Sequence, residues 1–386
     1  MKLNDMRREV IYLDNAATSW PKPKRVTDAM TRFLVEEAGS PDRAGHRMSL
    51  AAGRIVQGVR VKLARLFNVD DPRRLIHCFN CTDALNIALK GSLREGDHVI
   101  CTDMDHNSIS RPLQAMANAN VVKLTRLPVT GQGIVDPDAI RRAITPTTKL
   151  IVTVHASNVT GAIQPAGEIG NIARQHDVLL LLDAAQSVGV LDVDVVAMNI
   201  DLLAFPGHKS LLGPTGTGGL YVGRRAALRP FREGGSGADS ITPTQPTEFP
   251  TWLEAGTPNT AGLVGLDAAL DGLDPSQALI HERRLLERLA EAVSDDQRIR
   301  IVGDWSPSRC APVMSFLIGG LSTVDAAAIL DESFRIAVRP GLHCAPYIHR
   351  ALGTFPDGTI RVSPGWSTTA EEIEQLASAL REMAIA

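Results

Sequence analysis

Short apolar runs alternate with longer amphipathic stretches from about residue 75 to residue 225, and this alternation restricts the fold more than any other feature of the chain. The runs are almost continuously apolar, which is typical of strands buried on both faces of a parallel sheet. The stretches between them include helix candidates such as residues 165–177. The pattern therefore predicts an α/β fold with a mostly parallel, doubly wound sheet. The expected strands are residues 75–79, 98–102, 121–125, 150–155, 178–183, 202–205 and 218–222.

The flanking segments have a different pattern. Upstream, residues 49–67 fit an amphipathic helix with Ser49 as its N-cap. Downstream, residues 230–260 are rich in Gly, Pro, Ser and Thr, and a loop of that length is usually functional. Helix candidates follow at 279–294, 323–332 and 369–384. Strand candidates lie among them, at 313–318 and 334–338. A chain of 386 residues suits two or three domains. We expect an N-terminal segment near the active site over residues 1–20, a large domain over 21–259 and a small α+β domain over 260–386.

The charge balance and the cysteine content exclude several classes of protein. Lys plus Arg is 40 and Asp plus Glu is 43, so the formal net charge of −3 leaves no electrostatic footprint for nucleic acid or an anionic membrane. No apolar run approaches the length of a membrane span, and the N-terminus lacks the apolar core of a signal peptide. The five scattered cysteines favour a reducing compartment. We therefore expect a cytoplasmic protein that folds without disulfides or metal.

Polar residues follow several of the expected strands. Lys209 comes just after a buried strand, at the edge where open α/β sheets bind ligands, although a surface lysine in a loop would be the commoner explanation. Asp183 ends the most hydrophobic strand, where it could cap the next helix, face a ligand, or do both. Asn158 follows a third strand, and Thr82 lies at a helix start that could bind phosphate. A buried anion such as Asp183 would suit the pyridinium nitrogen of pyridoxal 5′-phosphate (PLP).

A set of short motifs runs in order over nearly the whole chain and resembles one enzyme family. The motifs are DNAATSWPKP, CTDALN, DHNS, HASNVTG, LLDAAQS, GHK, GPTGTGGLYVG, LEAGTPNT and RPGLHCAP. Together they resemble the class V branch of the fold-type I PLP-dependent enzymes, and more narrowly the cysteine desulfurases of the SufS/NifS kind. The resemblance implies conversion of L-cysteine into L-alanine, with the sulfur passed to an enzyme cysteine and then to an acceptor protein, as in iron–sulfur cluster assembly.

The resemblance also implies roles for residues around the cofactor. Lys209 would bind PLP covalently and later move protons at the substrate α-carbon. Asp183 would pair with the ring nitrogen, and His106 would stack over the ring. Asn158 and Gln186 would hydrogen-bond the phenolic oxygen of the ring or its surroundings.

Other residues would hold the phosphate and the substrate. Thr82 and His208 would bind the phosphate of PLP, and Thr257 would reach the phosphate site of the partner in a homodimer. Arg361 would grip the substrate carboxylate with its bidentate fork, a geometry that lysine does not offer. Arg339 would line the same pocket.

Cys344 is the expected sulfur acceptor. It lies in a Gly- and Pro-punctuated loop beside Arg339, His343 and His349, and cationic neighbours favour the nucleophilic thiolate. The thiolate would attack the substrate sulfur and become a persulfide. A small buried residue is the alternative interpretation, and it suits Cys78 and other cysteines in apolar runs better.

Two departures from the family pattern stand out. Position 206 is proline, where many relatives carry a hydroxyl residue that binds phosphate, so other donors must compensate. The connection from Glu233 to Glu254 also looks shorter than in the SufS branch, which affects the docking of an acceptor protein.

Three alternatives remain beside the desulfurase. A related PLP enzyme (an aminotransferase, an epimerase, or a selenocysteine or carbon–sulfur lyase) would not require Cys344. A nucleotide-binding oxidoreductase would require a G-x-G-x-x-G motif, but Tyr221 stands where its last glycine should be. A non-catalytic sulfur carrier would leave Lys209 and Asp183 unexplained. The C-x-x-C pair of Cys78 and Cys81 lacks a second pair at zinc-site spacing, and we expect no metal.

Overall fold

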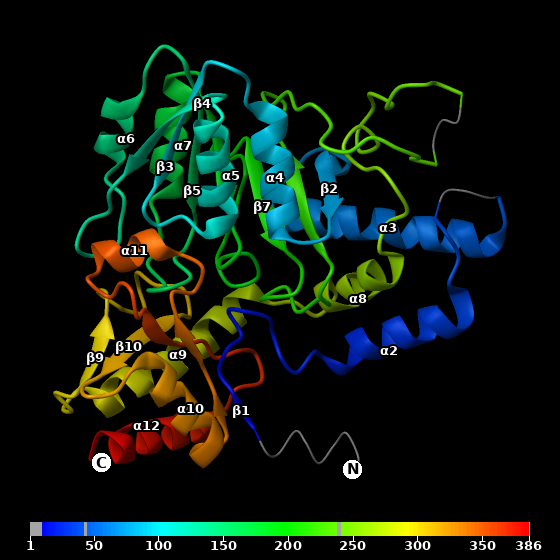
Figure 1. Ribbon diagram of the computed structural model, residues 1–386. Coiled ribbons are helices and arrows are strands. Elements are labelled where there is room, and N and C mark those ends of the chain that lie inside the picture. The colour runs from blue at the N-terminus through cyan, green and yellow to red at the C-terminus, as the bar shows by residue number, and fades with distance from the viewer. Residues whose placement is uncertain (1–9, 42–44, 238–240, 386) are drawn as a thin grey trace.

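The computed structural model describes residues 10–41, 45–237 and 241–385, and a seven-stranded sheet forms its centre (Figure 1). The strand order is β2-β8-β7-β6-β5-β3-β4, and in this sheet β8 alone runs antiparallel to its neighbours. All seven expected strands are present, so the predicted mostly parallel α/β fold is confirmed. The strands are β2 (Leu75–Cys78), β3 (Asp97–Thr102), β4 (Val122–Leu127), β5 (Thr148–Val154), β6 (Leu179–Asp183), β7 (Leu202–Pro206) and β8 (Gly218–Val222).

Helices cover both faces of this sheet and bury two separate apolar clusters. On one face, α4 and α5 bury Leu85 and Ile109 against the strands. On the opposite face, α3, α6, α7 and α8 bury residues such as Val59 and Ile169. The helices are α3 (Arg47–Leu66), α4 (Cys81–Ser92), α5 (Asn107–Asn118), α6 (Pro137–Ala143), α7 (Ala166–Gln175) and α8 (Thr260–Leu270), with α2 (Lys24–Arg32) packed beside α8.

Side-chain caps set where the helices of this domain begin. Asn80 caps α4 by accepting a hydrogen bond from the backbone N–H of Asp83, so the helix starts at Cys81 and exposes its first N–H groups at the end of β2. The cap of α3 is His46, whose ring accepts from the N–H of Ser49. Ser49 is therefore inside the helix, and the prediction that it caps α3 is wrong because histidine supplies the acceptor three residues earlier.

The C-terminal part of the chain forms a smaller antiparallel sheet covered by helices. Its strand order is β12-β13-β10-β9. Helices α9, α10 and α12 bury residues such as Leu286, Leu330 and Leu376 against it. The elements are α9 (Pro275–Val293), β9 (Ile299–Val302), β10 (Met314–Ile318), α10 (Thr323–Phe334), β12 (Arg339–Gly341), α11 (Pro346–Ala351), β13 (Thr359–Val362) and α12 (Ala370–Ile385). The expected strand at 334–338 is reduced to β11 (Ile336–Ala337), which pairs with β1 (Ile11–Tyr12) instead.

The N-terminal segment connects the two sheets. The backbone N–H of Leu13 donates to the carbonyl of Ala337 at 2.9 Å, and the N–H of Ser19 donates to that of His208 at 3.0 Å. The division at residues 20 and 259 stays a prediction, and Leu263 and Leu266 of α8 pack in the core of the large sheet. Among the described residues, no helix has the length and apolar character needed to cross a membrane.

Candidate active site

Seven of the residues expected around a cofactor line one cavity beside the carboxyl ends of β5, β6 and β7. They come from five separate segments of the large domain, which the parallel sheet brings to one edge. Pro206 also lines this cavity. The seven residues are Thr82, His106, Asn158, Asp183, Gln186, His208 and Lys209.

Lys209 lies in this cavity, and its side chain has no hydrogen-bond partner among the described residues. Burial, together with the charge of Arg361, lowers the pKa of its ammonium to about 8. The loop that carries Lys209 is held from behind by Gly189, where φ is +94° and a Cβ would meet the backbone of Ser210 at 2.5 Å. At pH 7 about a tenth of this amine is therefore neutral, far more than for an ordinary lysine, and the neutral amine is the nucleophilic form.

Asp183 supplies a buried negative charge to the same cavity. Its side chain is 3% exposed, and burial raises the pKa of its carboxyl. Two donors hold the carboxylate: the backbone N–H of Ala185 at 2.9 Å and the thiol of Cys81 at 3.4 Å. Burial raises the pKa of the Cys81 thiol well above its usual value, so that thiol keeps its proton and donates. Cys81 is thus a hydrogen-bond partner of the buried acid.

Two helix starts border the cavity. Thr82 is in the first turn of α4, and its hydroxyl lies 2.7 Å from that of Ser108 in the first turn of α5. His106 caps α5, with Nδ1 accepting from the backbone N–H of Ser108 at 3.1 Å. Burial lowers the pKa of His106 to about 4, so its ring is neutral near pH 7. Helix N-termini and hydroxyls together form a suitable site for a phosphate group.

Two buried polar atoms of the cavity residues have no partner among the described residues. These are Oδ1 of Asn158 and Nδ1 of His208. An unsatisfied buried polar atom is costly, and it commonly marks a place where a ligand or water completes the bonding. A ligand with polar groups toward Asn158 and His208, and a basic nitrogen toward Asp183, would complete this donor and acceptor set.

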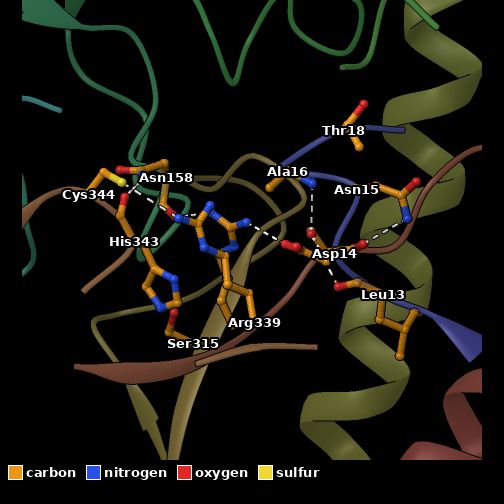
Figure 2. Close-up of polar contacts among 12 residues, drawn as sticks. Leu13, Asp14, Asn15, Ala16, Thr18, Asn158, Ser315, Arg339, His343 and Cys344 are labelled. Atoms are coloured by element: carbon orange, nitrogen blue, oxygen red, sulfur yellow. Dashed lines mark hydrogen bonds and ion pairs between the residues drawn. The ribbon is translucent and has the colours of Figure 1, made fainter. Parts of the chain in front are cut away.

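A buried arginine next to the cavity is held from two sides, by Asp14 and by the backbone of Asn158. Figure 2 labels both of these partners, together with Arg339 and Cys344. Arg361 of β13 is 1% exposed, and its Nη2 donates to Oδ1 of Asp14 at 2.6 Å. Its Nη1 donates to the backbone carbonyl of Asn158 at 3.1 Å, while Nε has no partner among the described residues. The N–H groups left over in this pre-oriented fork could bind a carboxylate.

The Cys344 loop is fixed by backbone contacts to the large domain. Asn158 donates from Nδ2 to the carbonyl of His343 at 2.6 Å, and the N–H of Asn107 donates to the carbonyl of Cys344 at 2.7 Å. His343 and Cys344 both have positive φ, at 49° and 59°, a strained backbone that often occurs at functional sites. Cys344 is exposed, and Nη2 of Arg339 lies 3.6 Å from its sulfur.

The residues that follow Cys344 pack on the large domain rather than on their own sheet. Ala345 and Ile348 belong to the apolar core beneath α4 and α5. Tyr347 of α11 lies under the guanidinium of Arg126 in β4, 3.9 Å from the ring centre. This packing holds the loop of the small domain against the cavity of the large domain.

The prediction that two histidines place positive charge beside Cys344 is wrong. His343 and His349 were expected as cationic neighbours, but they are 2% and 0% exposed. Burial lowers both pKa values, to about 4 for His349 and further for His343, so both rings are neutral near pH 7. Arg339 is the cation that contacts the sulfur.

Thr257 lies apart from the other expected residues. It is exposed and borders a second cavity, together with Arg60, Phe79 and Arg232. The single chain therefore leaves Thr257 outside the cavity of Lys209. Its expected role toward a partner chain stays a prediction.

Two charged residues near the site were not predicted individually. Asp14 is the counter-ion of Arg361. Lys22 donates from Nζ to Ser19 Oγ and to the carbonyl of His208, each at 2.7 Å, and burial lowers its pKa to about 8. Both lie in the motif DNAATSWPKP, so the motif itself was the signal that could have identified them.

Comparison with known proteins gives consistent matches over the whole chain. The family model described as aminotransferase class V matches residues 11–376. A probable cysteine desulfurase of Methanothermobacter thermautotrophicus is 35% identical and covers 100% of this chain and 98% of its own length. Among solved structures, the cysteine desulfurase from Thermococcus onnurineus NA1 has a TM-score of 0.91 at 31% identity, covering 100% of this chain and 99% of its own. The cysteine desulfurase CsdA from Escherichia coli has a TM-score of 0.86 at 28% identity, covering 100% and 98%.

Proposed function

The chain belongs to the class V aminotransferase family and is a cysteine desulfurase, and we propose that it divides the reaction between Lys209 and Cys344. Lys209 moves the proton at the substrate α-carbon, and Cys344 removes the sulfur of L-cysteine, leaving L-alanine. The observation that carries this proposal is the placement of an exposed cysteine, on a loop clamped by Asn158 and Asn107, beside the cavity that holds Lys209.

The residues of the cavity fit PLP as the cofactor. The carboxylate of Asp183 suits the protonated ring nitrogen, and the free Oδ1 of Asn158 and Nδ1 of His208 offer unused polar positions. Thr82 and the first N–H groups of α4 suit the phosphate, and they compensate for Pro206, which has no hydroxyl. When bound, PLP supplies an electron sink for the charge that develops at the substrate α-carbon.

Lys209 fits the role of the base. Its pKa of about 8 gives it a neutral fraction near neutral pH, which can accept the α-proton of the substrate. His106 stays neutral and offers an apolar ring face to the cavity rather than a charge. Arg361, held by Asp14 and the carbonyl of Asn158, would bind the substrate carboxylate, with Arg339 lining the same pocket.

Cys344 fits the role of the sulfur acceptor. In this step its thiolate forms a bond to the substrate sulfur while the bond from that sulfur to the substrate β-carbon breaks. The electron pair stays with the carbon fragment, which takes up protons and leaves as alanine. Nη2 of Arg339 lies 3.6 Å from Sγ and donates a hydrogen bond to it. The step leaves a persulfide on Cys344, ready for transfer to an acceptor.

The variant Cys344→Ser tests this division. The variant should keep bound cofactor and still change the cofactor absorbance when L-cysteine binds, because Lys209 and Arg361 are untouched. Alanine and sulfide formation should fall by orders of magnitude, since a hydroxyl does not replace a thiolate at neutral pH. Cys101→Ser, a change in a buried strand, is the matched control and should keep the activity of folded protein. Sulfide release by Cys344→Ser at the wild-type rate would favour a lyase.

We also propose a cytoplasmic homodimer in which Thr257 of each chain completes the phosphate site of the other. Thr257 is exposed and lies outside the Lys209 cavity of its own chain, and two-fold dimers are the commonest soluble assembly. Sedimentation at assay concentration should give a dimer, and Thr257→Ala should weaken cofactor retention. A fully active monomer would refute this arrangement.

A further inference from the structure

The face around Cys344 carries arginines that are not paired with carboxylates. Arg339 contacts the sulfur, Arg111 is exposed on α5, and Arg350 is exposed on α11. None of the three forms an ion pair with Asp or Glu among the described residues. Many other arginines of the chain do, as Arg224 does with Asp70 at 2.7 Å. We call Arg111, Arg339 and Arg350 the arginine rim.

The contacts of the loop place the rim near the sulfur. Arg111 lies about one helical turn after Asn107, whose N–H binds the carbonyl of Cys344. The positive charges of Arg111 and Arg339 both lower the pKa of His106, the residue just before Asn107. Arg350 lies about one turn along α11, the helix that begins two residues after Cys344.

Aromatic packing holds the guanidinium of Arg350 in place. Its guanidinium lies over the rings of Tyr347 and Phe355, 5.6 and 4.8 Å from their centres. Phe355 is 45% exposed, so the stack faces solvent. A guanidinium held in this way keeps its charge in a fixed place at low entropic cost.

Negative charge near the loop is scarce. From Arg335 to Pro356, which includes the whole Cys344 loop, the chain contains no Asp or Glu. Burial raises the pKa of Asp103, and the positive charges of Arg126 and Arg350 partly offset that rise. His343, His349 and His106 are neutral near pH 7, so the positive charges that we assign to this face are those of the arginines.

We propose that the arginine rim selects a sulfur acceptor whose reacting thiol lies in a negatively charged setting. The inference rests on the proposed persulfide at Cys344. In the transfer, the acceptor thiolate forms a bond to the terminal sulfur of the persulfide. The bond from that sulfur to Cys344 Sγ breaks, and Cys344 leaves as a thiolate with the electron pair. The terminal sulfur keeps its proton and moves to the acceptor, so no external oxidant or reductant is required.

Three small thiols test the selection on the intact holoenzyme. The persulfide is loaded by one turnover with L-cysteine, and its discharge is followed by mass spectrometry with 2-mercaptoethanesulfonate, 2-mercaptoethanol and cysteamine. Rates are compared per thiolate, because the three thiols differ in pKa. At low salt the sulfonate should react roughly three- to tenfold faster than the neutral thiol, the size expected from a few unit charges about 8 Å away in water. Cysteamine should be the slowest. These ratios should approach one near 1 M salt, because the Debye length is then about 3 Å.

Variants of the arginine rim test which residues cause the preference for the sulfonate. Arg111→Gln and Arg350→Gln should keep the alanine burst, because neither residue binds the substrate, and together they should remove most of the preference for the sulfonate. Arg65→Gln, an exposed arginine on α3, is the matched control and should change nothing. Tripeptides with a central cysteine flanked by Asp or by Lys test whether the acceptor is a protein. A larger ratio of rates between the Asp and Lys peptides than between the sulfonate and cysteamine indicates a protein acceptor.

The result that overturns the inference is distinct from failure of the proposed function. Equal, salt-independent discharge of the persulfide by all three thiols would refute the selection while leaving the desulfurase intact. If the rim variants do not fold, the salt dependence of the wild type decides alone. Absence of a persulfide on Cys344 would instead refute the proposed function.

Discussion

Replacing Lys209 by methionine should stabilise the cofactor-free protein at pH 7. Burial lowers the pKa of Lys209 from 10.5 to about 8, which means that the folded state disfavours the charged form of this side chain. Each pKa unit corresponds to 1.36 kcal/mol, so the ammonium costs the folded state up to about 3 kcal/mol below pH 8. This value is a ceiling, because Lys209 keeps partial contact with solvent. Methionine has a similar length, no charge and no hydrogen bond to lose at this position.

The stability difference between the two proteins should depend on pH. Between pH 8 and pH 10.5 the unfolded chain binds more protons at Lys209 than the folded chain does, so wild-type stability rises with pH over that window. The methionine variant lacks this contribution. Its advantage should therefore be largest below pH 8 and should shrink toward zero near pH 10.5.

Thermal unfolding of the two cofactor-free proteins at several pH values measures the effect. We expect the midpoint of Lys209→Met to be higher by a few degrees at pH 7 and the difference to be roughly halved at pH 9.5. Lys22→Met is the matched control. The pKa of Lys22 is also lowered to about 8, but its Nζ donates two hydrogen bonds, whose loss offsets the gain. A Lys209→Met protein that is less stable at pH 7, or whose advantage does not vary with pH, would refute this reasoning.

Three further changes test other parts of the site. Arg361→Lys should raise KM for L-cysteine at least tenfold while leaving the content of bound PLP unchanged, because the fork binds the substrate carboxylate; steady-state kinetics and the absorbance of PLP measure this. Asp183→Asn should weaken retention of PLP during dialysis and shift its absorbance, because the buried negative charge is lost; unchanged retention and spectrum would contradict the role of Asp183. Gly189→Ala should lower the free energy of unfolding by roughly 1–3 kcal/mol, since φ is +94° and a Cβ would meet the backbone of Ser210, and denaturant titration measures it.

The sheet could be predicted from the sequence because its strands are buried on both faces. Burial on both faces forces nearly continuous apolar runs, and β6, with Leu179 to Asp183 all buried, is the clearest example. The short strand β11 could not be predicted in the same way. Its residues Ile336 and Ala337 pair with Ile11 and Tyr12, more than three hundred positions away, and no local pattern encodes that pairing.

The positions of the site residues were predictable in part. Asp183 and Lys209 follow strands at one sheet edge, which the topology alone brings together. The charge state of the Cys344 surroundings was not predictable, because His343 and His349 look cationic in the sequence and become neutral through burial. The ion pair between Asp14 and Arg361 joins residues from opposite ends of the chain, and only the folded structure shows it.

A single turnover with L-cysteine, without reductant, tests the division of labour between Lys209 and Cys344 most directly. The holoenzyme is mixed with a slight excess of L-cysteine, quenched and digested, and the peptide containing Cys344 is weighed while alanine is counted. We expect one alanine per active site and a gain of one sulfur atom on Cys344, with the peptides of Cys78, Cys81, Cys101 and Cys310 unchanged. Stoichiometric alanine with an unmodified Cys344, or with the added sulfur on another cysteine, would contradict the assignment of Cys344 as the sulfur acceptor.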